Sequence, residues 1–308
     1  MSNRKPRYLA LVIAVAAVAV SACGGSGLSG RSGGAHGKFL VVAAESFWGS
    51  IAAQLAGDRA QVRSIIVNPA TDPHSYTPTA FDGEVIAQSR LAIVNGLGYD
   101  KWADQALAAS PSSDRVVLNV GDLLGLREGD NPHRWYFPAN VHSVIDRIVA
   151  DYVRLDPADS AYFAHRKQTF ETQDLAQYNR LRQEIRARYS GVPVGYSESI
   201  FQGLGQDLGL RLLTPYSFTK AIAEGSDVSA ADKQTVDNQA QSGQIRVWVY
   251  NSQNATPDVQ RVSSIAEAKR IPSVTVTETL SPASESFAQW QVAELRGLLR
   301  ALHSGTGR

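Results

Sequence analysis

Two histidines and two glutamates occupy positions that suit the binding of a metal ion. His74 and His133 each follow a proline directly. Glu198 and Glu278 each follow a short apolar run of the kind that forms a strand. A preceding proline stiffens the backbone, which helps a ligand to keep its direction before the metal arrives. Two imidazoles and two carboxylates make an N₂O₂ set, which suits Zn²⁺, Mn²⁺ or Fe²⁺.

The residues alone leave a second interpretation open. A single Pro-His pair is weak evidence for a ligand, and its repetition in one chain is stronger evidence. In the alternative, His74 and His133 have ordinary solvated or packing roles, while Glu198 is a surface acid and Glu278 caps a helix. The other histidines lie near the chain ends or in helices without a partner at metal-binding spacing, and we assign solvated or packing roles to His36, His142, His165 and His303.

The elements that must position these side chains alternate along the chain. From Lys38 onward, short apolar runs alternate with longer amphipathic stretches, which predicts parallel α/β units. The predicted strands are residues 39–43, 62–67, 91–95, 116–119, 192–196, 211–213, 245–250 and 273–277. The predicted helices are residues 46–55, 82–88, 101–108, 140–152, 199–207, 229–242, 257–269 and 285–303. Open α/β sheets bind ligands at the carboxyl ends of their strands, where His74, Glu198 and Glu278 are expected.

One long helix is predicted between the two halves. Asp156 and Pro157 are residue types that start helices, and no glycine or proline follows before Tyr189. A helix of about 30 residues is roughly 45–50 Å long, which suits a connection between two lobes better than the cover of one sheet. The predicted fold class is α/β, with two Rossmann-like lobes of parallel sheets joined by a single long α-helix and a metal site in the interlobe cleft. We predict lobes at residues 38–153 and 191–308 and the linking helix at residues 154–190.

The N-terminus has the pattern of an export signal. Arg4, Lys5 and Arg7 precede an apolar run over residues 9–20, which is shorter than the about 20 residues of a membrane span. The sequence Val-Ser-Ala-Cys at 20–23 resembles a bacterial lipobox, which is cut before a cysteine that receives lipid. We predict a signal peptide over residues 1–22, then a lipidated Cys23 and a glycine-rich tether to residue 37. The alternative is an ordinary secretory signal with a stray cysteine.

Composition excludes several classes of protein. With 44% hydrophobic and 19% charged residues in 308, the chain can bury a core. The chain has 30 basic and 29 acidic residues, and the counts are 27 and 29 once residues 1–22 are removed. A nucleic-acid-binding protein needs an excess of basic residues on one face, so no nucleic-acid partner is expected. The single cysteine excludes an intramolecular disulfide and any multi-cysteine metal site.

Three motifs resemble those of a known family. They are Asp-Pro-His at 72–74, Gly-Leu-Gly at 96–98 and Pro-His-Arg-Trp at 132–135. Together they resemble the cluster A-I (class III) substrate-binding lipoproteins of zinc and manganese ABC importers. The order of lipobox, N-terminal lobe, helix and C-terminal lobe also matches, and the resemblance covers about residues 38–302.

The resemblance implies a function and a set of ligands. It implies an exported binding protein, not an enzyme, that captures one divalent ion (Zn²⁺ or Mn²⁺) and delivers it to an ABC transporter permease. The protein would be a monomer held by lipid at the outer face of the cytoplasmic membrane, at the cell surface or in the periplasm. The family's four ligands correspond to His74, His133, Glu198 and Glu278, the third by counting eleven residues back from the Gly-Leu pair at 209–210.

The chain also departs from the family's pattern. The loop rich in histidine and acidic residues that many zinc-specific members carry is absent from the sequence between the first two ligands. Glu198 at the third position is more typical of manganese binders, because carboxylates favour harder ions and higher coordination. Glu278 replaces the more common Asp, and Asn131 replaces an Asp that would support His133. The identity of the metal and its coordination number therefore stay open.

Two other functions are considered. A siderophore- or cobalamin-type binding protein with a helical strut would have an aromatic and Arg-lined cleft without a histidine pair. An exported metallohydrolase needs a general base beside an open metal position, and the sequence has no His-Glu-x-x-His run. Gly203 and Gly205 stand without the other glycines of a dinucleotide-binding motif, and we interpret them as glycines of a loop.

Overall fold

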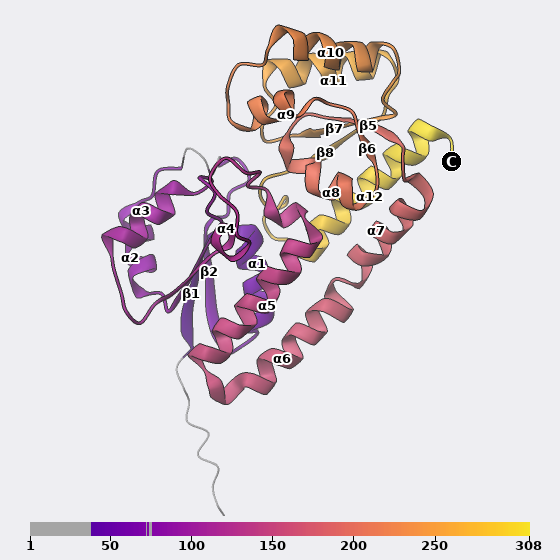
Figure 1. The fold of residues 1–308 in the computed structure, drawn as a ribbon. Coiled ribbons are helices and arrows are strands. Elements are labelled where there is room, and N and C mark those ends of the chain that lie inside the picture. Colours follow the sequence, from indigo (N-terminus) through magenta and orange to yellow (C-terminus); the bar gives the residue numbers. More distant parts are fainter. Residues whose placement is uncertain (1–37, 72, 74–75) are drawn as a thin grey trace, which may run out of the picture. The chain divides into compact units, whose positions relative to one another are not determined.

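Two parallel β-sheets with the same strand order form the frame of the protein (Figure 1). The computed structural model describes residues 38–308 with the exception of 72, 74 and 75. The first sheet has the order β2-β1-β3-β4, with strands Phe39–Glu45 (β1), Ala60–Ile66 (β2), Leu91–Val94 (β3) and Val116–Asn119 (β4). The second has the order β6-β5-β7-β8, with strands Pro193–Tyr196 (β5), Arg211–Leu212 (β6), Val247–Asn251 (β7) and Ser273–Val276 (β8). Each predicted strand is present, with ends shifted by at most a few residues, which confirms the predicted fold class.

The sheet order places one crevice in each lobe. The first strand of each sheet lies between the second and the third, so β1 separates β2 from β3 and β5 separates β6 from β7. All of these pairs are parallel, so the carboxyl ends of the strands lie along one edge of each sheet. Strands covered on both faces are continuously apolar, and all four residues of β3 are buried. The point where the strand order reverses is where open α/β sheets bind ligands.

Helices connect the strands and cover the sheets (Figure 1). The first lobe contains Ser46–Ala56 (α1), Ala80–Gln88 (α2), Lys101–Ala109 (α3), Val120–Leu123 (α4) and Pro138–Leu155 (α5). The second contains Gln202–Asp207 (α8), Tyr216–Ala223 (α9), Ala230–Gln241 (α10), Pro257–Ala268 (α11) and Phe287–Thr306 (α12). The sequence did not predict α4, which is too short for a periodic pattern, or α9, which starts without a side-chain cap. Within the described part of the chain, the helices lack the combined length and apolarity needed to cross a membrane.

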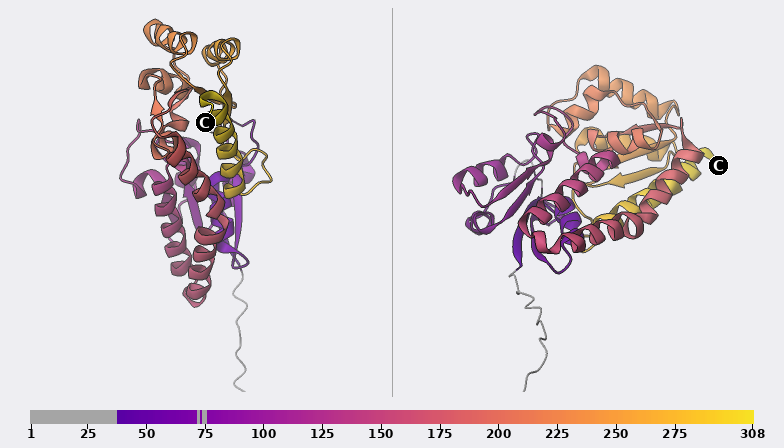
Figure 2. Two further views of the ribbon diagram at one scale, coloured as in Figure 1. Left: turned by 90° about the vertical axis from the view of Figure 1, so that its right-hand side faces the viewer. Right: turned by 60° about the horizontal axis from the view of Figure 1, so that its bottom comes forward.

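The linking helix follows the predicted path with one interruption. A 3₁₀ turn (Pro157–Asp159) leads into α6 (Ser160–Thr169), a π-helical turn (Phe170–Asp174) and α7 (Ala176–Tyr189). The C-terminal helix α12 lies beside α7 (Figure 2). At its start the backbone N–H of Phe287 donates to Ser50 Oγ on α1 at 2.8 Å. Helix α12 is therefore a second connection between the lobes, which the sequence analysis did not predict.

The two lobes share one apolar core. Phe47 of α1 stacks on Trp135 with ring centroids 3.8 Å apart, and Tyr136 packs edge-on against Trp290 of α12 at 5.7 Å. The hydroxyl of Tyr136 lies 2.7 Å from Glu294 Oε2, to which it donates a hydrogen bond. Residues 38–308 form one compact unit. The division at residues 153 and 190 stays a prediction about the organisation of the chain.

Gly203 marks a place where the lobes approach closely. It lies within α8, not in a loop as the sequence analysis interpreted it, and a Cβ at this position would overlap the ring of Phe137. The guanidinium of Arg134 lies over the same ring, with its Cζ 4.4 Å from the centroid. We expect Gly203→Ala to lower the free energy of unfolding by about 1–3 kcal/mol, because the packed ring must move.

Gly83 provides a matched control. It lies inside α2, and a Cβ there would meet nothing within 4 Å among the described residues. Gly83→Ala should raise the free energy of unfolding by about 0.5–1 kcal/mol, because alanine loses less backbone entropy in a helix. Urea titration of both variants measures the two changes. Equal effects of the same sign would contradict the close approach at Gly203.

Candidate metal centre

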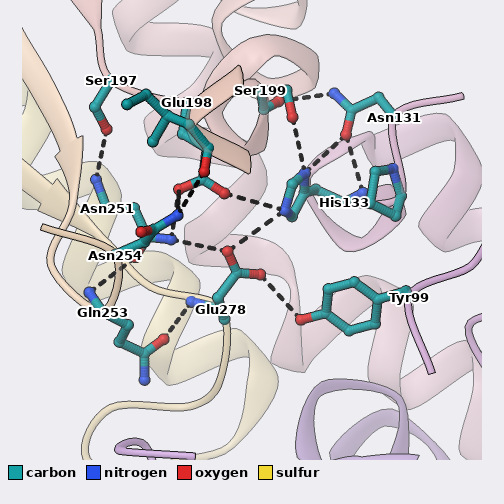
Figure 3. Close-up of polar contacts among 12 residues, drawn as sticks. Tyr99, Asn131, His133, Ser197, Glu198, Ser199, Asn251, Gln253, Asn254 and Glu278 are labelled. Atoms are coloured by element: carbon teal, nitrogen blue, oxygen red, sulfur yellow. Dashed lines mark hydrogen bonds and ion pairs between the residues drawn. The ribbon is translucent and has the colours of Figure 1, made fainter. Parts of the chain in front are cut away.

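Three polar side chains meet where loops of the two lobes come together (Figure 3). His133 precedes the 3₁₀ turn Arg134–Tyr136 of the first lobe, while Glu198 follows β5 and Glu278 follows β8. The Nε2 atom of His133 lies 3.5 Å from Glu198 Oε1 and 3.4 Å from Glu278 Oε1. The three residues are 0%, 1% and 7% exposed, respectively. The structure thus brings together three of the four predicted metal ligands.

The spacing and the unused hydrogen-bonding capacity fit a small cation. The candidate ligand atoms of these residues all lie within 4.8 Å of one another. Metal–ligand bonds of about 2.0–2.2 Å in a tetrahedron separate neighbouring ligand atoms by roughly 3.3–3.5 Å. Nε2 of His133 is fully buried and makes no hydrogen bond in the described part of the chain. A buried nitrogen without a partner costs free energy, which binding of a cation would recover.

The remaining predicted residues lie outside the described residues. These are His74, the fourth predicted ligand, and Cys23, the predicted lipidation site. Residues 69–71, which precede His74 in the sequence, line a cavity of about 720 Å³ together with Glu198 and Glu278. The cavity therefore has walls from both lobes.

Asn131 fixes the orientation of the His133 ring. Its Nδ2 donates to the carbonyl oxygen of Ser199 at 2.7 Å and to Gln202 Oε1 at 3.1 Å. Its Oδ1 therefore faces His133, where it accepts the backbone N–H at 3.0 Å and lies 2.8 Å from Nδ1. An acceptor beside Nδ1 keeps the proton on that nitrogen and leaves the lone pair of Nε2 for a ligand. The side-chain amide of Asn131 thus accepts the hydrogen bond that an Asp at this position would accept, but it carries no negative charge.

Burial sets the protonation of the site. It lowers the pKa of His133 to about 4, so the imidazole is neutral at pH 7. Burial and the nearby charge of Glu278 raise the pKa of Glu198 to about 8. At neutral pH the metal-free site therefore holds a neutral imidazole and a protonated Glu198.

The sequence analysis missed the neutral side chains that hold the carboxylates. Asn251, the last residue of β7, donates from Nδ2 to Glu198 Oε2 at 2.9 Å and to Glu278 Oε1 at 2.8 Å. Tyr99 follows β3 and donates from its hydroxyl to Glu278 Oε2 at 2.9 Å (Figure 3). The strand-end position that indicated Glu198 also applies to Asn251, so this signal was present in the sequence.

The other described histidines stand apart from this cluster. In the part of the chain that the structure describes, the only group of three or more candidate ligands is the one around His133. His142 was predicted to lack an acidic partner, but its Nδ1 lies 3.5 Å from Glu171 Oε1, because the π-helical turn faces α5. His165 is exposed on α6. The half-exposed His142 has a single acidic neighbour, and two ligands are too few for a metal site.

The fold and this cluster define a two-lobed α/β protein with a candidate transition-metal centre. The model of the family described as zinc-uptake complex component A periplasmic (ZnuA) matches residues 41–301, and the chain belongs to this family. The resemblance on which the sequence analysis relied is thereby confirmed. Among solved structures, a manganese-bound periplasmic metal-binding protein from Candidatus Liberibacter asiaticus superposes with a TM-score of 0.71 at 20% identity, over 86% of this chain and 100% of that chain.

Curated relatives bear the names of different metals. The chain is 29% identical to the iron-binding protein YfeA of Yersinia pestis over 185 residues, and 27% identical to the manganese-binding lipoprotein MntA of Halalkalibacterium halodurans over 177 residues. These matches cover 56% and 55% of this chain, and 58% and 57% of those proteins. The chain thus spans less than two thirds of the curated relatives it matches. Their names leave the metal of this chain open.

The raised pKa of Glu198 predicts proton release on metal binding. A metal displaces the proton from the carboxylate, so below about pH 8 the affinity should fall about tenfold for each pH unit. His133 adds nothing to this slope near neutrality, because its pKa is already low. Calorimetry at pH 7 in buffers of different ionisation enthalpy should report about one released proton per metal. An affinity that stays constant between about pH 6 and pH 8 would contradict the assignment.

Proposed function

We propose that this protein captures one divalent transition-metal ion, Zn²⁺ or Mn²⁺, outside the cytoplasm and delivers it to the permease of an ABC importer. The observation that carries the proposal is the buried cluster of His133, Glu198 and Glu278, in which Nε2 of His133 points at two carboxylates. The chain's membership of a zinc-uptake family and its similarity to relatives named as iron- and manganese-binding proteins support this proposal.

Four protein ligands would hold the ion. His133, Glu198 and Glu278 supply three, and we assign the fourth to His74. Residues 69–71, which precede it in the sequence, line the same cavity. The described lining of the cavity also includes Glu224 and several neutral polar side chains, but no lysine or arginine. A cation can therefore approach the ligands without passing a positive charge.

The same lining argues against the other functions considered. Among the described residues of the cavity there is no arginine and no aromatic side chain, which a siderophore or cobalamin site would require. A catalytic metal keeps one position open for water or substrate, whereas four protein ligands close a tetrahedral site. We therefore assign the protein to binding and delivery and propose no catalytic step.

Export and anchoring follow from the N-terminal sequence. We propose that residues 1–22 are removed, that Cys23 is lipidated, and that residues 24–37 tether a monomeric binding domain to the outer face of the cytoplasmic membrane. A glycine-rich tether of this length would let the domain reach a permease in the same membrane.

Metal analysis of the domain from Lys38 onward tests the proposed ligands. After removal of metal with a chelator and exposure to equal Zn²⁺ and Mn²⁺, the protein should retain one equivalent of metal. His74→Ala and His133→Ala should each weaken binding at least about 100-fold while the protein stays folded, since a ligand is lost. His165→Ala, an exposed histidine of α6, is the matched control and should bind as the wild type does. Unchanged affinity in both site variants would refute the site.

Cell fractionation tests the anchor. Cys23→Ser removes the thiol that would carry the lipid, so the protein should move from the membrane fraction to the soluble exported fraction. Metabolic labelling with a radioactive fatty acid should mark the wild type and not the variant. An unlabelled wild type in the soluble exported fraction would favour the ordinary secretory signal.

A further inference from the structure

Glu294 of α12 is a half-buried acid whose carboxyl group contacts residues of both lobes. Its Oε2 lies 2.7 Å from the hydroxyl of Tyr136, which belongs to the first lobe. Its Oε1 accepts the backbone N–H of Thr277 at 3.0 Å, just after β8 of the second lobe, and lies 3.2 Å from Thr277 Oγ1. One side chain thus links two segments that are far apart in the sequence.

Both partners of Glu294 adjoin candidate metal ligands. Tyr136 closes the 3₁₀ turn that begins after His133, and its backbone N–H donates to the carbonyl oxygen of His133 at 3.1 Å. Thr277 directly precedes Glu278 in the chain. Glu294 itself lies outside the group of candidate ligands. It therefore lies on a path of bonds that joins a ligand of one lobe to a ligand of the other.

Thr277 is held at each of its polar groups. Its carbonyl oxygen lies 3.0 Å from the hydroxyl of Tyr136. Its own hydroxyl accepts the indole N–H of Trp290 at 2.9 Å and lies 2.9 Å from the carbonyl oxygen of Thr279, to which it donates. With the bond from its N–H to Glu294, these contacts fix the backbone at the point where the segment carrying Glu278 begins.

We propose that Glu294 is a positioning residue that sets the separation of His133 and Glu278. It acts through Tyr136 and Thr277 and does not bind the ion itself. The inference rests on the proposed function, because it concerns the same metal centre.

The spacing of the two ligands leaves little room for movement. Nε2 of His133 lies 3.4 Å from Glu278 Oε1. Two atoms bound to one ion at about 2.0–2.2 Å can be at most about 4.4 Å apart. A relative shift of the two segments by about 1 Å therefore brings the pair to the limit at which both can bind one ion.

Two substitutions separate the hydrogen bonds of Glu294 from the rest of its side chain. Glu294→Met keeps the length of the side chain and removes both links. Glu294→Gln keeps them, because an amide accepts with its oxygen and donates with its nitrogen, and the hydroxyls of Tyr136 and Thr277 can each do either. Burial raises the pKa of Glu294 to about 8, so at pH 7 the amide replaces a mostly uncharged group.

The affinity for Zn²⁺ at pH 7, measured by competition with a chromophoric chelator, tests the inference. We expect Glu294→Met and Tyr136→Phe each to weaken binding at least about tenfold, because the ligand spacing is no longer held. Glu294→Gln should bind within about threefold of the wild type, since both links remain. Because the two residues act on one path, the double variant Tyr136→Phe/Glu294→Met should bind at most about twofold more weakly than Glu294→Met alone.

Asp151→Asn is the matched control. Asp151 is a buried acid of helix α5 whose carboxylate accepts from Arg147 Nε at 2.9 Å, and it lies outside the group of candidate ligands. This variant should lose stability and keep the affinity of the wild type. It therefore shows what the loss of a buried carboxylate does when no ligand segment depends on it.

Cobalt reports the arrangement of the ligands directly. The d–d absorption bands of bound Co²⁺ depend on the geometry of the ligands. The bands of Glu294→Met should shift, and those of Glu294→Gln and Asp151→Asn should match the wild type. A purely structural role of Glu294 would lower stability without changing these bands.

The outcomes separate this inference from the proposed function. Wild-type affinity and unshifted bands in folded Glu294→Met and Tyr136→Phe would overturn the positioning role and leave metal binding in place. An equal loss of affinity in Glu294→Gln and Glu294→Met would also overturn it, because the links would then be irrelevant. Should Glu294→Met fail to fold, as judged by circular dichroism, Tyr136→Phe and Glu294→Gln carry the test. A wild type that binds neither Zn²⁺ nor Co²⁺ would overturn the proposed function itself.

Discussion

Burial of two carboxylates beside an imidazole is the constraint on which the rest of the structure depends. Acids removed from water and held near each other favour protonation over charge, as the raised pKa of Glu198 shows. The protein offsets this cost with uncharged donors, above all the amide of Asn251, and leaves Nε2 of His133 without a hydrogen bond among the described residues. A positive ion is the partner that this arrangement of groups lacks.

The two sheets make such burial possible. Parallel strands end together, so Glu198, Asn251 and Glu278 come from neighbouring ends of one sheet, while His133 arrives from the other lobe. Neither lobe alone would enclose the cluster. The common aromatic core of Trp135, Tyr136 and Trp290 holds the lobes at the distance that the side chains require.

The sequence predicted the parts of the site that have a local signal. Pro-His turns and acids after apolar strands made His133, Glu198 and Glu278 candidates, and the family resemblance then selected them as ligands. Strand periodicity with an uninterrupted helix indicated the two lobes. The role of Gly203 could not be predicted, because it depends on the ring of Phe137 brought near by folding. The orientation of Asn131 could not be predicted for a similar reason, because it depends on Ser199 and Gln202 of the second lobe, whose oxygens accept the two hydrogen bonds of its Nδ2.

The paired helices α7 and α12 have a mechanical consequence. The two helices lie side by side, and the start of α12 is hydrogen-bonded to Ser50 of the first lobe. The lobes are therefore connected by two adjacent helices. Two such connections restrain the separation of the lobes more than one helix would. Under the proposed function, we therefore expect exchange of the ion to depend on short segments that line the cavity, such as the contact of Gln253 Nε2 with Pro69 O, more than on movement of whole lobes.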